Sequence, residues 1–167
     1  MKTIIFVVAL LALFIGCTSQ REDQLTAQQR DQVKSEVKAT LDSMMVKFEN
    51  LDASGFIQYY WDSPDFISYA PDGSRSDFPA FKKSVTEFCN SGATVKPTLV
   101  RAEFTVLTNE LVITAWVGKS VVSFKSGDKA IYNPDAVTWV FKNFAGHWKI
   151  IYSHESATIT MQTAGKK

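Results

Sequence analysis

The chain has 167 residues, of which 46% are hydrophobic, 13% aromatic and 21% charged, and its formal net charge at pH 7 is +1. This composition is typical of a globular domain and argues against a disordered chain. Acidic and basic residues are interleaved without a basic stripe, so no nucleic-acid partner is expected. Without the N-terminal leader described next, about 150 residues are left, which is the length of one domain.

Residues 1–16 have the pattern of an export signal peptide. A short positive region precedes an apolar run, Ile4–Ile15, that is too short for a transmembrane helix. Gly16-Cys17 follows directly and resembles the lipobox of bacterial lipoproteins, although Phe14 stands where that motif usually has Leu. The resemblance implies that Cys17 is the lipid-attachment site. An ordinary secretory leader cut near Ser19 is the alternative.

The chain has two cysteines, Cys17 and Cys89. If Cys17 carries lipid, Cys89 has no disulfide partner and is expected to be a buried apolar residue. Residues 17–25 then form the lipidated cysteine and a polar tether. The expected location is the bacterial cell envelope, with the membrane as a partner through the lipid anchor, and the outer membrane if the source is Gram-negative.

Three helices are predicted at the start of the domain. Thr26 and Gln29 form a capping box, and apolar residues then recur every three or four positions over about six turns. Asp52 caps a second, short helix, and Pro64 ends it. A third helix begins near Ser76 or Asp77, and its apolar residues predict one buried face.

The rest of the domain is predicted to be β-structure. The expected strands are residues 65–70, 94–108, 111–125, 136–142 and 148–160. The later strands are joined by short turns, so antiparallel pairing is expected, and helices followed by a sheet indicate the α+β class. A lipocalin barrel is disfavoured because it begins with strands. Residues 161–167 are expected to be a flexible tail.

The order of these elements resembles the SnoaL-like branch of the nuclear transport factor 2-like superfamily. The turn Pro71-Asp72-Gly73 and the closing segment Gly146–Ser156 carry the resemblance, because Trp, an aliphatic residue, His and Ser recur there at alternate positions. It covers the domain from residue 26 to 160. It implies a cone-shaped, curved antiparallel sheet wrapped around three N-terminal helices (a cystatin-like roll) with an apolar pocket. Members include isomerases, dehydratases, cyclases and non-catalytic binding modules, so the fold alone does not define a reaction.

Alternation along the last strand places His154 on the same face as Trp148 and Tyr152, which we take as the inner face. A histidine there could act as a general acid or base, or could be a structural residue hydrogen-bonded to Ser156 or to a helix residue. Asp65 is the second candidate catalytic residue, since a carboxyl group near an apolar pocket can carry protons. A turn-forming role for Asp65 is the alternative.

Six aromatic residues are predicted to line the pocket, with core packing as the alternative for each. They are Tyr60, Trp61, Tyr69, Trp116, Trp139 and Tyr152. No histidine or cysteine pair has metal-ligand spacing, so neither a metal nor another cofactor is expected.

The favoured function is that of an envelope-anchored pocket protein that binds a small, mostly apolar molecule. One alternative is a cofactor-free isomerase, dehydratase or cyclase that uses His154 as acid or base. The other is a dimeric interaction module, in which a face of the sheet forms a homodimer or docks a partner.

Overall fold

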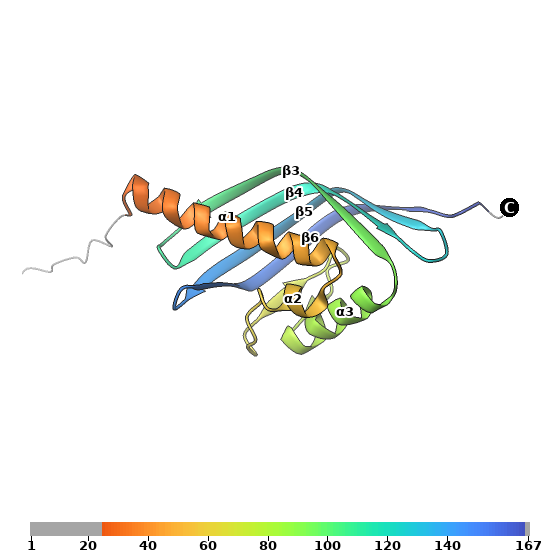
Figure 1. The fold of residues 1–167 in the computed structure, drawn as a ribbon, viewed down its shortest axis with the longest axis horizontal. Helices are drawn as coiled ribbons and strands as arrows, with labels where there is room; N and C mark the ends of the chain where they lie inside the picture. Colours follow the sequence, from red (N-terminus) through yellow and green to blue (C-terminus); the bar gives the residue numbers. More distant parts are fainter. Residues whose placement is uncertain (1–24, 166–167) are drawn as a thin grey trace, which may run out of the picture.

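The computed structural model describes residues 25–165 (Figure 1). The predicted signal peptide, the lipid-attachment site Cys17 and nearly all of the tether lie outside the described residues. None of the helices in the described part of the chain has the length and apolar character needed to cross a membrane.

The three helices are α1 (Ala27–Glu49), α2 (Ala53–Ile57) and α3 (Phe78–Asn90). Each begins after a residue whose side chain accepts a backbone hydrogen bond from the first turn, namely Thr26, Asp52 and Asp77. The capping box is confirmed, because the Thr26 N–H donates to Gln29 Oε1 at 2.8 Å and the Gln29 N–H donates to Thr26 Oγ1 at 3.2 Å.

Helix α2 ends at Ile57, well before Pro64, where the sequence predicted its end. The chain after α2 pairs with the last strand instead of continuing the helix. The Trp61 N–H donates to the Ile150 carbonyl at 2.9 Å, and the Ile150 N–H donates to the Tyr59 carbonyl at 2.8 Å. These tertiary hydrogen bonds override the local helical pattern.

Six strands form one sheet in the order β2-β1-β6-β5-β4-β3. They are β1 (Ile67–Tyr69), β2 (Arg75–Ser76), β3 (Thr94–Val106), β4 (Leu111–Ser123), β5 (Lys129–Phe144) and β6 (His147–Gln162). All neighbouring pairs are antiparallel except β1 and β6, which are parallel. The sheet is therefore mixed, whereas a purely antiparallel sheet was predicted.

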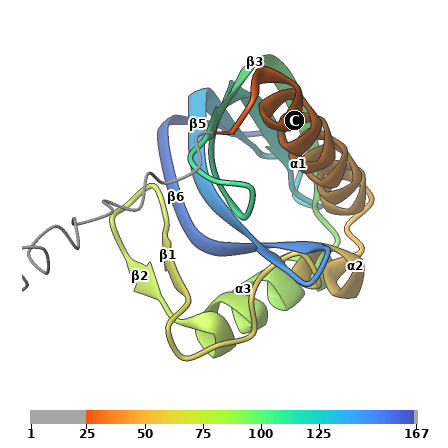
Figure 2. The ribbon, with the colours of Figure 1, turned by 90° about the vertical axis from the view of Figure 1, so that its left-hand side faces the viewer.

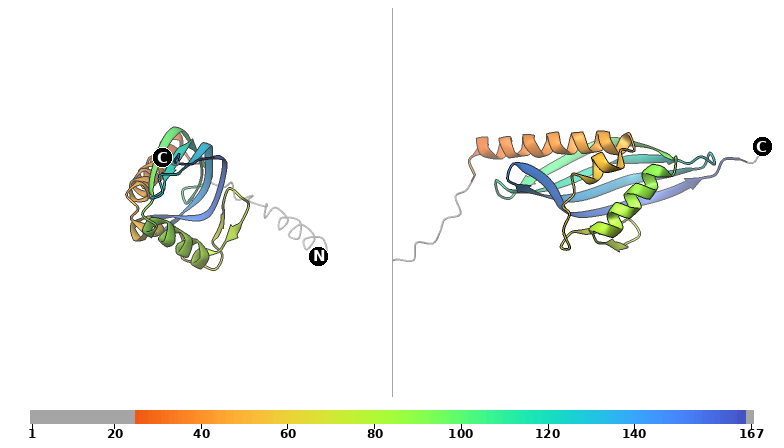
Figure 3. Two further views of the ribbon diagram at one scale, coloured as in Figure 1. Left: turned by 90° about the vertical axis from the view of Figure 1, so that its right-hand side faces the viewer. Right: turned by 60° about the horizontal axis from the view of Figure 1, so that its bottom comes forward.

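The sheet curves around the helices, as predicted from the resemblance. Helix α1 runs along the concave side next to β3, and α3 covers the opposite end of the same side (Figure 2). In the right-hand view of Figure 3, α2 and α3 lie in front of the strands and α1 runs above them. The buried core fills the space between them, with Val37, Met44, Phe66, Phe141 and Ile150 almost completely buried. The α+β cone is confirmed.

Strand β5 begins at Lys129, seven residues before the predicted start at Ala136. Asn133-Pro134 precede the predicted start of this strand, but both residues lie within β5, in a bulge where its register shifts between Tyr132 and Asp135. Strand β6 extends to Gln162, so the predicted tail begins two residues too early.

A second bulge decides which side chains of β6 face inward. Val140 pairs with Tyr152, but the next residue of β5, Phe141, pairs with Ile150, which leaves Ile151 as an extra residue. Because side chains alternate strictly along a strand, one extra residue exchanges the two faces. Before the bulge, the inner face of β6 therefore carries Ile150. Beyond the bulge, it carries Ser153.

Candidate functional site

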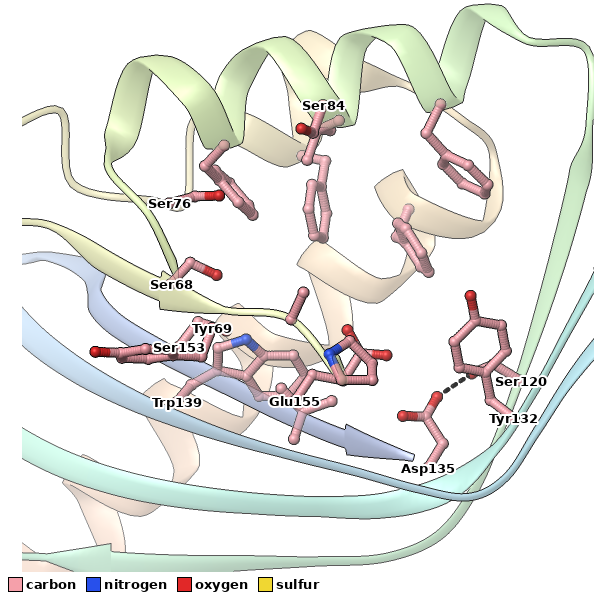
Figure 4. A pocket seen from close by; sticks show the side chains of 18 of the residues that line it. Ser68, Tyr69, Ser76, Ser84, Ser120, Tyr132, Asp135, Trp139, Ser153 and Glu155 are labelled. Atoms are coloured by element: carbon pink, nitrogen blue, oxygen red, sulfur yellow. Dashed lines mark hydrogen bonds between the residues drawn. The ribbon is translucent and has the colours of Figure 1, made fainter. Parts of the chain in front are cut away.

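A cavity of about 460 Å³ lies between the concave face of the sheet and the helices. Figure 4 shows α3 on one side of this cavity and strands of the sheet on the other. Most of the wall is apolar and aromatic, including Phe48, Phe56, Phe81, Phe88, Trp116 and Trp139. Cavities of this size with a few polar groups are typical of small-molecule sites.

Two carboxyl groups, Asp135 and Glu155, line the cavity from adjacent strands. Glu155 on β6 pairs with Val137 on β5, so Asp135 is its diagonal neighbour on the same face. Asp135 is only 4% exposed. Its Oδ2 accepts a hydrogen bond of 2.6 Å from the Ser120 hydroxyl on β4.

The surroundings raise the pKa of both carboxyl groups. Burial is the main cause for Glu155, and the nearby Asp135 adds to it, so the pKa of Glu155 reaches about 7. Burial also raises the pKa of Asp135, while the hydrogen bond from Ser120 opposes that rise. The Glu155 carboxyl is therefore close to half-protonated at neutral pH.

The phenols near this pair stay protonated. Burial raises the pKa of Tyr132, and the two carboxyl groups raise it further. Tyr60 is fully enclosed, and burial raises its pKa strongly. Both hydroxyl groups can therefore act as hydrogen-bond donors inside the cavity at neutral pH.

Two buried polar atoms of the cavity wall have no hydrogen-bond partner among the described residues: Asp135 Oδ1 and Trp139 Nε1. The Trp139 indole lies near Tyr60, but the two groups do not meet the geometry of a hydrogen bond. Buried polar atoms without partners are rare in folded proteins, because each costs about 1–3 kcal/mol. One acceptor and one donor are therefore available to a bound molecule.

The other end of the cavity carries hydroxyl groups. Ser68 on β1 and Ser153 on β6 are neighbours in the sheet and are both buried. Ser76 on β2 pairs with Ser68, and Ser84 lies on α3 across the cavity (Figure 4). Each hydroxyl can donate or accept a hydrogen bond, so this end tolerates several polar groups of a ligand.

Four of the six aromatic residues predicted to line the pocket do so, namely Tyr60, Tyr69, Trp116 and Trp139. Trp61 does not, and its ring stacks on Phe144 with the ring centroids 5.5 Å apart. Tyr152 does not either, because the bulge at Ile151 turns it away from the face that carries Ser153.

The two predicted catalytic residues do not line the cavity. His154 is exposed, so its expected inward orientation is wrong, and the bulge before it is the physical reason. Its ring lies beside that of Tyr69, with the centroids 5.8 Å apart. Asp65 is exposed in the turn before β1, where its N–H donates to the Ser63 hydroxyl at 3.2 Å, in agreement with the alternative turn-forming role.

Cys89 is half-buried near the end of α3 rather than fully buried as expected. Burial raises the pKa of its thiol, and the charge of Asp52 adds to this. A thiol in this state is a poor nucleophile. In the described residues, no three His, Cys, Asp or Glu side chains are grouped in a way that could hold a metal ion.

The carboxyl pair was not predicted from the sequence. Alternation counted from Trp148 places Glu155 on the outer face, and Asp135 lies just before the strand predicted from Ala136. The adjacent Ile150 and Ile151 are the one local signal, because apolar residues at consecutive positions interrupt the alternation and fit a bulge.

Comparison with known proteins gives a family and a fold. The family model of the SnoaL-like domain matches residues 37–160. Among curated proteins, no sequence matches the chain significantly.

Several solved structures share the fold. A proposed scytalone dehydratase from Novosphingobium aromaticivorans aligns with a TM-score of 0.69 at 8% identity, over 85% of this chain and 94% of that chain. A proposed dehydratase of the NTF2-like family from Streptomyces avermitilis gives 0.67 at 14% identity, over 77% and 97%. The association domain of CaMKII from C. elegans gives 0.62 at 12% identity, over 78% and 99%. At these identities the likeness shows the fold alone. With the family match over most of its length, the chain belongs to the SnoaL-like domain family, and its fold is that of the nuclear transport factor 2-like proteins.

Proposed function

We propose that this protein binds a small, mostly apolar molecule in the cavity between the sheet and α3. The observation that carries this proposal is the cavity itself, about 460 Å³ in volume, with aromatic walls and polar groups gathered at a few places. The unpartnered Asp135 Oδ1 and Trp139 Nε1 support it, because a ligand with one donor and one acceptor would satisfy both atoms.

The test uses a probe and a blocked cavity. N-phenyl-1-naphthylamine is a neutral, apolar dye, and we expect its fluorescence to rise on saturable binding to the wild-type protein. Val137→Phe places a larger side chain on the cavity wall and should abolish the rise. Val140→Phe makes the same change on the outer face of the same strand and should leave it intact. Equal dye binding by both variants, or no saturable binding, would contradict the proposal.

Proton-transfer catalysis is the second candidate function, and the state of Glu155 favours it. A carboxyl group whose pKa is raised to about 7 can both accept and donate a proton near neutral pH. Glu155 would be the acid or base, a role first predicted for His154, while the Tyr132 hydroxyl could donate a hydrogen bond to developing negative charge. Glu155→Gln should then lower the turnover of a substrate by about 10²–10⁴-fold.

We propose further that lipid at Cys17 anchors the domain to the bacterial cell envelope. The support is the lipobox-like sequence that follows the apolar run of the leader. Cys17→Ala should move the protein from the membrane fraction to the soluble fraction of cells, while Cys89→Ala should leave it with the membrane. Membrane association that survives Cys17→Ala would contradict this proposal.

A further inference from the structure

The cavity has an uneven charge balance. Of the described residues that line it, Asp135 and Glu155 are the only acids, and none is Lys, Arg or His. Neither carboxyl group forms an ion pair with another described residue. An ionised carboxylate buried without a positive partner is unfavourable. The cavity can therefore accommodate a positive charge that its own side chains do not supply.

The carboxyl pair is also incompletely hydrogen-bonded. Ser120 satisfies one oxygen of Asp135, but Oδ1 is buried with no partner. Figure 4 shows that this oxygen points away from Ser120. A ligand that donates a hydrogen bond and carries positive charge would satisfy the oxygen and neutralise the pair in one contact.

The walls around the pair suit the same kind of ligand. Trp116, Trp139 and Tyr132 line the cavity together with the two carboxyl groups. Faces of Trp and Tyr rings attract organic cations, and this attraction strengthens when the site is shielded from water. Helices α1 and α3 add apolar side chains and Ser84 to the lining, without a charged group.

We propose that the molecule bound in the cavity is a small organic ammonium ion with an apolar body, and that Asp135 and Glu155 hold its positive end. This inference rests on the proposed binding function and specifies the class of ligand. The titratable groups that face Glu155 are Asp135 and Tyr132 from β5 and Tyr60 from the segment after α2. At pH 8 Glu155 is ionised, whereas at pH 5 it is protonated, so the affinity for an amine should fall on acidification.

The test compares three probes that differ mainly in the charge of one end: 4-phenylbutylamine, 4-phenylbutan-1-ol and 4-phenylbutyrate. Isothermal titration of the wild-type protein at pH 8 should show the amine binding about ten-fold or more tighter than the alcohol, since a hydrogen bond to a charged group contributes about 1.5–3 kcal/mol. The carboxylate probe should bind weakest. Glu155→Gln should remove most of the preference for the amine over the alcohol. Glu110→Gln, in the exposed turn between β3 and β4, is the matched control and should bind all three probes like the wild type.

The outcomes separate this inference from the function on which it rests. If the amine and the alcohol bind equally, or the carboxylate binds best, the ammonium inference is overturned while the cavity remains a binding site. If none of the three probes binds, and the neutral dye does not bind either, both proposals fail. If Glu155→Gln fails to fold, the order of the three probes on the wild-type protein still decides the question.

Discussion

The raised pKa of Glu155 makes a prediction about stability. In the unfolded chain this carboxyl group should lose its proton near its usual pKa of 4.5, whereas in the folded protein it holds the proton until about pH 7. Between these values the folded state binds more protons, so the free energy of unfolding should fall as the pH rises through this window. At about 1.4 kcal/mol per pH unit, the total loss is about 3 kcal/mol.

Glu155→Gln removes this titration, because the amide stays neutral. Measured by urea unfolding, the variant should therefore gain about 3 kcal/mol relative to the wild type between pH 4.5 and pH 8. Comparing the two proteins at each pH cancels the contribution of other groups, such as Asp52 and Asp128, whose pKa values are lowered by hydrogen bonds. Glu110→Gln controls for the loss of one negative charge. A difference between variant and wild type that is the same at both pH values would refute the argument that burial controls Glu155.

Three further predictions test the site and the assembly. Ser120→Ala removes the hydrogen-bond donor to the buried carboxyl of Asp135 and should lower the free energy of unfolding, measured by urea unfolding, by about 1–3 kcal/mol. A loss below about 0.5 kcal/mol would mean that the 2.6 Å hydrogen bond contributes little. Gly118→Ala would place a Cβ 2.3 Å from the Thr98 carbonyl oxygen and 2.5 Å from the Trp116 ring. Calorimetry should therefore show destabilisation by about 1–3 kcal/mol, and an unchanged Tm would contradict this close packing. If the outer face of the sheet forms a homodimer, light scattering should give about twice the mass of the chain, and a monomeric mass at every concentration would disprove it.

The helices could be predicted well because their signals are local. The Thr26–Gln29 capping box and the cap at Asp77 each depend on residues three positions apart, and both helices begin where expected. Helix α2 was predicted too long because its end depends on hydrogen bonds with β6, which a local pattern does not contain.

The site was harder to predict because two bulges determine it. The extra residue Ile151 exchanges the faces of β6, so alternation counted from Trp148 puts His154 inside and Glu155 outside, the reverse of the structure. The bulge at Asn133-Pro134 keeps the chain in β5 although these residues favour a turn, and it places Asp135 on the inner face. In both places the pairing with neighbouring strands overrides the local pattern.

The most direct test of the account is an NMR titration of the indole N–H signals during addition of 4-phenylbutylamine. The four tryptophans report on different places: Trp116 and Trp139 line the cavity, Trp61 stacks on Phe144, and Trp148 donates from Nε1 to Glu36 at 3.2 Å. We expect large shifts for Trp139 and Trp116 that saturate together, with little change at Trp61 and Trp148. Shifts confined to Trp61 or Trp148, or no saturable shift at Trp139, would contradict a ligand site in this cavity.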